Sequence, residues 1–365
     1  MGRHRFGLVV KIIIVSTYPK GRKKGFGLKK KHDLKSKESP NSYLLRILLD
    51  ASPYYVSGSA IAKKLNVSRV AIWARISKLR KEGFAIEAYQ NRGYRLASEP
   101  NNFNHELLIA WLMKVKENCK IYVYDAIDST NSEAERLLVD GESGPFTVIA
   151  KQQNIGRGRI GKKWHSPPDN GNLYLSIAFR PNIDALKLRI FTLWQGICIC
   201  NYLQSFTENK EILLKWPNDI VIHGKKLGGM LTEASINCEN IRYLIFGFGL
   251  NINSKIANYP LSIKKLAYSL FEIKKETYRI HEITANLIKV ILSSYKECYK
   301  GINSIEFSNS WNKLDALFNK RVSLSYGNKT FKGIGKGISP TGGLIIKLNS
   351  GELKTFHSGE VLSFK

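Results

Sequence analysis

The sequence is poor in acidic residues. It has 29 Asp and Glu against 57 Lys and Arg in 365 residues, which gives a formal net charge of +28 at pH 7. A charge of this size favours an acidic partner such as nucleic acid, a nucleotide or an acidic protein. The charge is also uneven, because residues 1–37 hold twelve Lys and Arg and a single acid, Asp33.

Long apolar runs are missing as well. The apolar stretch from Leu8 to Val15 is interrupted by Lys11 and has no small-residue cleavage site, so neither a membrane span nor a signal peptide is expected. The five cysteines are scattered, and Cys198-x-Cys200 has no neighbouring His. Reduced thiols in a cytoplasmic protein are therefore favoured over disulfides or zinc, and no residue is assigned to a metal.

The first 98 residues divide into two parts. Residues 1–40 are basic and rich in glycine, and we interpret them as a disordered extension, with a non-specific nucleic-acid arm as the alternative. Residues 41–98 show helical periodicity followed by a two-stranded pattern about a glycine turn. The expected helices are Ser42–Asp50, Ser57–Asn66 and Arg69–Arg80, and the expected strands are Phe84–Tyr89 and Tyr94–Leu96.

This order is typical of a winged helix-turn-helix, whose third helix enters the major groove of DNA. Between Lys63 and Arg95 there are nine Lys and Arg but only two acids, which favours DNA over an ordinary three-helix packing unit with a solvated basic face. The residues predicted to contact DNA are Ser68, Arg69, Arg75 and Lys78. The predicted core stripe of the third helix is Val70, Ile72 or Trp73, Ile76 and Leu79.

A polar linker, Ala97–Asn104, leads to the rest of the chain. Residues 105–318 have mixed α and β patterns, which predict a largely antiparallel or mixed sheet. Residues 319–365 contain about five short apolar alternations separated by turn residues, which predict a small barrel.

The segment Lys151–Trp164 holds three glycines and five cations but no acid, and it lies between two strand-like runs. Its cations and backbone N–H groups are suited to wrapping an anion. A solvated surface loop and an arginine–glycine tract that touches nucleic acid are the alternatives. Three other motifs are weak when taken singly: Asp128–Asn131, Lys215–Asp219 and Gly247-x-Gly249.

Together and in this order, the motifs resemble those of bifunctional biotin–protein ligases that also repress the biotin operon. The resembling segments run from about residue 41 to the C-terminus: Ser68–Arg80, Arg92–Leu96, Ile127–Asn131, Gln152–Trp164, Asn172–Ser176, Lys215–Asp219, Lys226–Gly229, Gly247–Ile252 and Trp311–Asp315. The resemblance implies a multidomain α+β fold. It has a winged helix-turn-helix at 41–98, a mixed-sheet α/β ligase domain of class II synthetase type at 105–318, and an SH3-like β-barrel at 319–365.

The resemblance also implies the reaction. Biotin and ATP, with Mg²⁺, give biotinyl-5′-AMP, and a lysine of biotin carboxyl carrier protein then takes the biotin. Operator DNA is the other implied partner, bound by a homodimer when the adenylate is present.

Site residues follow from matching the motifs. We expect Lys215, Arg157 and Arg159 to neutralise the repulsion between the carboxylate and the phosphate. The expected biotin contacts are Ser129, Thr130, Asn131, Gln152, Gly156, Arg157, Gly158, Arg159, Trp164, Lys215, Gly247 and Gly249. The expected ATP contacts are Arg157, Arg159, Lys162, Asn218, Lys226 and Asn251.

Two features depart from the family pattern. Ile160 stands where the family often has arginine, which predicts looser retention of the adenylate, and residues 1–38 have no counterpart. Three other functions stay open: a regulator that senses biotin without ligating it, a ligase that has lost its operator, and a lipoate or octanoate transferase of the same fold.

Overall fold

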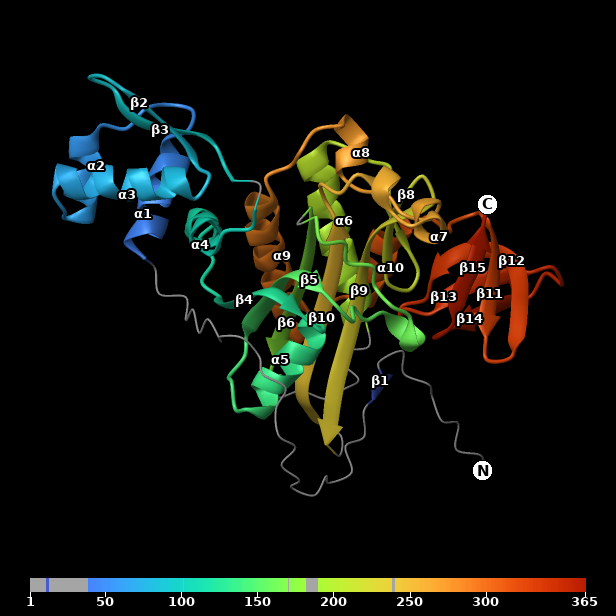
Figure 1. Ribbon diagram of the computed structural model, residues 1–365. Helices are drawn as coiled ribbons and strands as arrows, with labels where there is room; N and C mark the ends of the chain where they lie inside the picture. Colours follow the sequence, from blue (N-terminus) through green and yellow to red (C-terminus); the bar gives the residue numbers. More distant parts are fainter. Residues whose placement is uncertain (1–10, 13–38, 101, 170, 182–189, 238–239) are drawn as a thin grey trace.

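The computed structural model describes residues 11–12, 39–100, 102–169, 171–181, 190–237 and 240–365. Figure 1 shows a small N-terminal unit, a central sheet with its helices, and a second sheet at the C-terminal end. Lys11–Ile12 form strand β1, which pairs in parallel with β9 (Lys225–Asn237). This strand lies within the extension predicted to be disordered, as do Ser39 and Pro40, which cap and begin the first helix. Residues 1–10 and 13–38 lie outside the described residues.

The N-terminal unit is the predicted helix-turn-helix with a wing. Its helices are α1 (Pro40–Ala51), α2 (Gly58–Leu65) and α3 (Arg69–Lys81), followed by the antiparallel strands β2 (Ala85–Tyr89) and β3 (Gly93–Ser98). Ser57 and Ser68 cap α2 and α3 through their side chains, and Asn66 ends α2 in the left-handed region. Gly83, at φ +95°, follows α3 as expected.

The predicted core stripe of α3 is partly wrong. Ile72, Ile76 and Leu79 are fully buried, but Val70 is 75% exposed and Trp73 59% exposed. Ile72 already faces the core, and Val70 and Trp73 lie on the opposite side of the helix. Periodicity alone could not choose between adjacent apolar residues.

Helix α4 (His105–Lys114) joins the N-terminal unit to the central domain. It packs against α1 on one side and α9 (Ile280–Lys300) on the other, so Leu107 to Leu112 are all buried. The preceding linker is tied down too, because Trp111 Nε1 donates to Glu99 Oε1 at 3.0 Å and the Asn104 amide donates to His281 Nε2 at 2.8 Å.

The central sheet is mixed, with the strand order β4-β5-β6-β10-β9-β8-β7. Strands β4 and β5 are parallel, and the other neighbours in this order are antiparallel. The strands are β4 (Lys120–Ile127), β5 (Phe146–Gln153), β6 (Asn172–Phe179), β7 (Ile212–Lys215), β8 (Asp219–Ile222), β9 and β10 (Asn240–Asn251).

Helices cover both faces of this sheet (Figure 1). Helices α6 (Phe191–Thr207) and α9 pack on one face with the main core, while α5 (Thr130–Val139) packs on the other with a smaller cluster. The two clusters divide adjacent strand residues, with Ile149 in one and Val148 in the other, as alternation along a strand requires. None of the described helices could cross a membrane.

Short elements connect the central sheet to the C-terminal part. They are the 3₁₀ turn Ile256–Asn258, α7 (Leu261–Lys264), α8 (Phe271–Lys274) and α10 (Ser304–Asn312). The C-terminal sheet is antiparallel in the order β14-β13-β12-β11-β15. Its strands are β11 (Arg321–Tyr326), β12 (Lys329–Ile338), β13 (Leu344–Leu348), β14 (Leu353–Phe356) and β15 (Glu360–Phe364).

Candidate active site

A pocket opens where the start of α5, the end of β5 and the middle of strands β6, β9 and β10 meet. The residues that line it are Ser129, Thr130, Asn131, Gln153, Arg157, Trp164, Tyr174, Leu175, Gly229, Leu231, Gly247, Phe248 and Gly249. Two of the three motifs that are weak when taken singly, Asp128–Asn131 and Gly247-x-Gly249, therefore meet here with the glycine–arginine loop.

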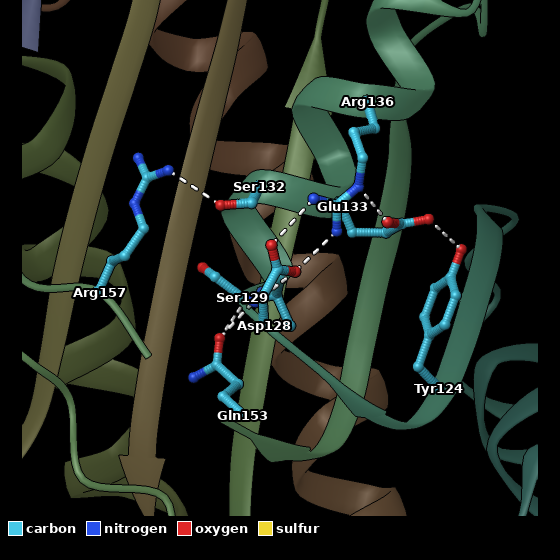
Figure 2. Close-up of polar contacts among 9 residues, drawn as sticks. Tyr124, Asp128, Ser129, Ser132, Glu133, Arg136, Gln153 and Arg157 are labelled. Carbon is cyan, nitrogen blue, oxygen red and sulfur yellow. Dashed lines mark hydrogen bonds and ion pairs between the residues drawn. The ribbon is translucent and has the colours of Figure 1, made fainter. Parts of the chain in front are cut away.

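The first turn of α5 supplies the polar residues. Ser129 stands at the N-cap position, yet its side chain makes no capping bond, so its hydroxyl is available to a ligand. The turn is held from outside, since Arg136 pairs with Asp128 at 2.7 Å (Figure 2). Side-chain hydrogen bonds from Arg136 dominate the lowering of the Asp128 pKa.

Behind the pocket wall the polar side chains of Thr130 and Asn131 bond two residues that do not line the pocket. Ser176 Oγ lies 2.7 Å from Thr130 Oγ1 and 2.5 Å from Asn131 Oδ1. Asn131 Nδ2 donates to Glu233 Oε2 at 2.9 Å. All four residues are buried. Their positions are thus fixed before any ligand binds.

The structure corrects one site residue. Gln153 (Figure 2), and not the predicted Gln152, lines the pocket, and its Oε1 accepts from the Thr130 amide at 2.9 Å. Adjacent residues of a strand point to opposite faces, so only one of the pair can reach the pocket. We call Ser129, Thr130, Asn131, Gln153 and Ser176 the polar end of the site.

Glycines form the floor of the pocket. A Cβ on Gly247 would lie 2.2 Å from Asn131 Oδ1, and a Cβ on Gly249 would lie 2.6 Å from Trp164 Cε2. Only glycine permits these approaches. The indole of Trp164 lies against Gly249 and Gly229, and its buried Nε1 has no hydrogen-bond partner among the described residues. The site therefore offers a flat apolar wall with a free donor.

The glycine–arginine loop folds into a tight hairpin. The Trp164 amide donates to Gly156 O at 2.8 Å, and the Gly158 amide donates to Lys162 O at 2.7 Å. A Cβ on Gly156 would lie 2.7 Å from Trp164 O, so glycine is required there. Arg157 anchors the hairpin, because its guanidinium pairs with Glu233 and bonds Ser132 Oγ at 2.9 Å (Figure 2).

The tip of the hairpin is Ile160, which is 74% exposed and has φ +53°. A β-branched residue is strained in this left-handed region. The neighbouring Lys162 forms an ion pair with Glu360 of β15. The loop therefore spans the gap between the central sheet and the C-terminal sheet.

Three cations gather beyond Trp164: Arg159, Lys215 and Lys226, which we call the cationic side. Lys226 Nζ lies 5.2 Å from the centre of the Trp164 ring, which itself lines the pocket, and 2.7 Å from Asp219 Oδ1. Arg159 donates to Asn218 Oδ1 at 3.3 Å. Lys215 stands opposite Asp219 in the β7–β8 pair.

The cationic side is short of negative charge. In the described part of the chain neither Lys215 nor Arg159 has a carboxylate within ion-pair distance. Burial lowers the pKa of Lys215, an effect that Asp219 opposes and Lys226 reinforces. Burial also lowers the pKa of Arg159. Lys215 Nζ lies 5.6 Å from the ring of Phe364, so the C-terminal sheet closes this side. An anionic ligand would supply the missing charge.

Comparison with known proteins agrees with this geometry. A sequence model of the biotin/lipoate A/B protein ligase family matches residues 123–251, an HTH domain model matches 41–95, and a biotin protein ligase C-terminal domain model matches 317–362. The bifunctional ligase/repressor BirA of Bacillus subtilis is 30% identical over 322 residues, which cover 87% of this chain and 97% of that protein. The chain belongs to the family of bifunctional biotin–protein ligases and repressors.

Other members give the same result. The ligase/repressor BirA of Escherichia coli is 28% identical over 321 residues, covering 86% of this chain and 95% of that one. The biotin protein ligase of Aquifex aeolicus, solved in complex with biotin and ATP, superposes with a TM-score of 0.57 at 30% identity. It covers 67% of this chain and 98% of its own.

Within this biotin ligase fold, two predicted nucleotide contacts are engaged elsewhere. Asn251 is buried and does not line the pocket: its Nδ2 donates to Tyr268 O at 2.9 Å and its Oδ1 accepts from Tyr259. Asn218 Nδ2 donates to Met230 O at 2.6 Å, which leaves Asn218 Oδ1 beside Arg159.

The predicted DNA contacts differ in their surroundings. Ser68 and Arg69 are exposed at the start of α3, and Lys78 is exposed beside Glu82 at 3.8 Å. Arg75 is half-buried and donates to Asn41 Oδ1 at 3.3 Å, so it joins α3 to α1 rather than pointing freely outward.

The main residue that sequence reasoning missed is Glu233. It bonds Asn131 and Arg157, which are 102 and 76 residues away in the chain. A lone glutamate inside an apolar strand is a signal for a buried polar partner, but it does not say which one.

Proposed function

We propose that this chain activates biotin with ATP to biotinyl-5′-AMP and transfers the biotin to a lysine of a biotin carboxyl carrier protein. The observation that carries the proposal is the adjacency of two unlike regions. A neutral polar end, buried except for Gln153, lies next to a cationic side on which Lys215 and Arg159 have no carboxylate partner among the described residues.

The two regions suit the two ends of biotin. The ureido head is neutral and needs several hydrogen bonds, which Ser129, Thr130 and Asn131 can supply. The fused rings would lie on the glycine floor against Trp164. The carboxylate would then point to the cationic side.

The cationic side would carry out adenylation. The biotin carboxylate and the α-phosphate are both anions, so their approach needs positive charge at the reacting atoms. Lys215 and Arg159 would provide it, and the carboxylate oxygen would displace pyrophosphate. No nucleophilic side chain is required, because the carrier lysine attacks the acyl carbon and AMP leaves.

Magnesium is part of this proposal. It would enter with the nucleotide, bound largely by phosphate oxygens. Asn218 and Asp219 would be its neighbours on the protein, because their side chains carry oxygen atoms beside Arg159 and Lys226. The predicted contacts of Asn251, Lys162 and Lys226 with ATP stay proposals.

The ligase test is a transfer assay with a purified biotin carboxyl carrier domain, biotin and ATP, read by mass spectrometry. We expect biotin on one lysine and release of AMP, and lipoate or octanoate should neither replace biotin nor compete with it. Equal use of lipoate would overturn the biotin assignment. A carrier that stays unmodified at every ATP concentration would leave only a biotin-sensing regulator.

We also propose that α3 and the wing bind operator DNA and that a homodimer forms when adenylate is bound. The basic surface of residues 63–95 supports DNA binding. Affinity should fall steeply with salt and be higher for the operator than for a scrambled duplex. Equal affinity for both would reduce the protein to a ligase without repression.

The finer architecture belongs to the proposal as well. We assign residues 1–40 to an extension, 41–98 to the DNA-binding domain, 105–318 to the ligase domain and 319–365 to the C-terminal domain. We also propose a class II synthetase-like catalytic fold and an SH3-like C-terminal domain. The C-terminal sheet of the described chain is open, since β14 and β15 stand at its two ends, so this domain would be a partly open barrel.

A further inference from the structure

The outward face of α3 has an apolar centre. Val70 is 75% exposed and Trp73 59% exposed, and a spacing of three residues puts them on the same face. Ala74 and Ser77 continue that face, and neither is buried. The core of the N-terminal unit uses the opposite face, and Val70 and Trp73 are not part of it.

The surroundings of this face are cationic. Lys63 and Lys64 lie in the last turn of α2, Arg69 begins α3, and the first turn of α3 has no acid. The two acids of this region are paired away from the start of α3. Glu82 lies 3.8 Å from Lys78, and Glu87 lies 2.6 Å from Arg95. An apolar centre with a cationic rim is complementary to a duplex, whose phosphates are charged and whose groove floor is partly apolar.

We infer that Val70 and Trp73 read thymine methyl groups in the major groove, which makes them specificity residues for the operator. This inference rests on the proposed repressor function. Helix-turn-helix proteins contact base edges with the N-terminal residues of the recognition helix, and Val70 and Trp73 are the second and fifth residues of α3. The 5-methyl of thymine is the apolar group that distinguishes base pairs in that groove. The cations of the rim contact phosphates and carry no sequence information.

The test uses the full chain with biotin and ATP. A duplex is first enriched from a pool of random sequences, and each thymine is then replaced singly by uracil, which removes only the methyl group. We expect at least one position where uracil weakens binding about fourfold, the effect of exposing one methyl group. In the V70A/W73A double variant this difference should vanish, so thymine and uracil duplexes should bind equally.

Two controls keep the test specific. Leu353→Ala removes a side chain that is 63% exposed on β14, and it should keep the preference for thymine. Lys64→Gln should weaken thymine and uracil duplexes by the same factor, because a phosphate contact does not sense the methyl. Ligase activity and melting temperature should stay at the wild-type values in the double variant, which excludes misfolding.

The outcomes separate the two levels of the proposal. If no sequence is enriched, the repressor function fails and the inference with it. If a sequence is enriched but no uracil position weakens wild-type binding, only the inference is overturned. The inference is also overturned if replacing thymine by uracil still weakens binding in V70A/W73A. If that variant in addition loses self-association, this face of α3 is a contact between copies of the chain.

Discussion

The polar end and the cationic side of the active site are built in different ways. At the polar end the hydrogen-bonding groups are buried and bonded to one another, as in the cluster of Asn131, Ser176 and Glu233. On the cationic side Lys215 and Arg159 are half-buried, yet no described carboxylate pairs with either. The first region is held in place by its own hydrogen bonds and leaves the Ser129 hydroxyl for a ligand, whereas the second becomes electrostatically complete only with an anion.

The difference indicates a division of labour. A satisfied network holds its geometry, which suits recognition of a neutral head group. A cation without a carboxylate partner stabilises most strongly a state in which negative charge accumulates. The approach of two anions creates such a state. Changes at the polar end should therefore alter biotin binding, whereas changes on the cationic side should alter adenylation.

The largest effect on binding is expected from Gly249→Val. The Cβ alone would lie 2.6 Å from Trp164 Cε2, so the indole must leave its place on the floor. Biotin affinity should fall on the order of 100-fold, in line with overpacking a tight site. Isothermal titration with biotin checks this. An affinity within threefold of wild type would show that Trp164 is not a wall of the biotin site.

Ser129→Ala should weaken biotin binding roughly tenfold, the loss of one hydrogen bond to the ligand. Its melting temperature should not change, since Ser129 makes no capping bond. Ser68→Ala is the matched control: Ser68 caps α3 by accepting from the Ala71 amide at 3.1 Å.

The control should show the reverse pattern. Ser68→Ala should destabilise the N-terminal unit by about 1 kcal/mol and leave biotin affinity unchanged. Thermal unfolding and biotin titration of both variants decide the point. A Ser129→Ala protein that loses stability and keeps its affinity would make Ser129 a structural residue.

The pH dependence of adenylation should reveal Lys215. Because burial lowers its pKa, the ammonium loses its proton at a lower pH than an exposed lysine, and kcat/KM for ATP should fall on the alkaline side accordingly. Asp219 raises this pKa, so Asp219→Asn should move the alkaline limb to lower pH. Pyrophosphate exchange measured across pH checks the direction. If the alkaline limb of Asp219→Asn stays at the wild-type pH, deprotonation of Lys215 is not its cause.

The smallest effect concerns the loop tip. Ile160→Asn should stabilise the hairpin, because asparagine tolerates φ +53° and isoleucine does not. Exchange of the Gly158 amide hydrogen, bonded to Lys162 O at 2.7 Å, should slow by up to about fivefold. Ile155→Asn is the control, since Ile155 is 61% exposed but has ordinary φ. Equal slowing in both variants would refute strain as the cause.

Sequence patterns predicted the N-terminal unit well, because its signals are local. Caps such as Ser57 and Ser68, the left-handed Asn66 and the glycine after α3 all act within a few residues. The motifs of the site were also recognisable, and those at Asp128–Asn131 and Gly247-x-Gly249 meet in one pocket.

What failed depended on direction or on distant partners. Gln152 and Gln153 are chemically identical, and only the phase of β5 decides which one faces the pocket. Val70 was assigned to the core because an apolar side chain on a recognition helix looks like a core residue. The pairing of Lys162 with Glu360 joins residues 198 apart and follows from tertiary packing alone.

The most direct test of the division of labour is single-turnover formation of biotinyl-5′-AMP by Lys215→Ala at saturating biotin and ATP. We predict a rate at least about 100-fold below wild type, as for loss of a group that stabilises developing charge, with the dissociation constant for biotin nearly unchanged. Adenylate formation within fivefold of the wild-type rate would contradict the assignment of Lys215 and place charge neutralisation elsewhere.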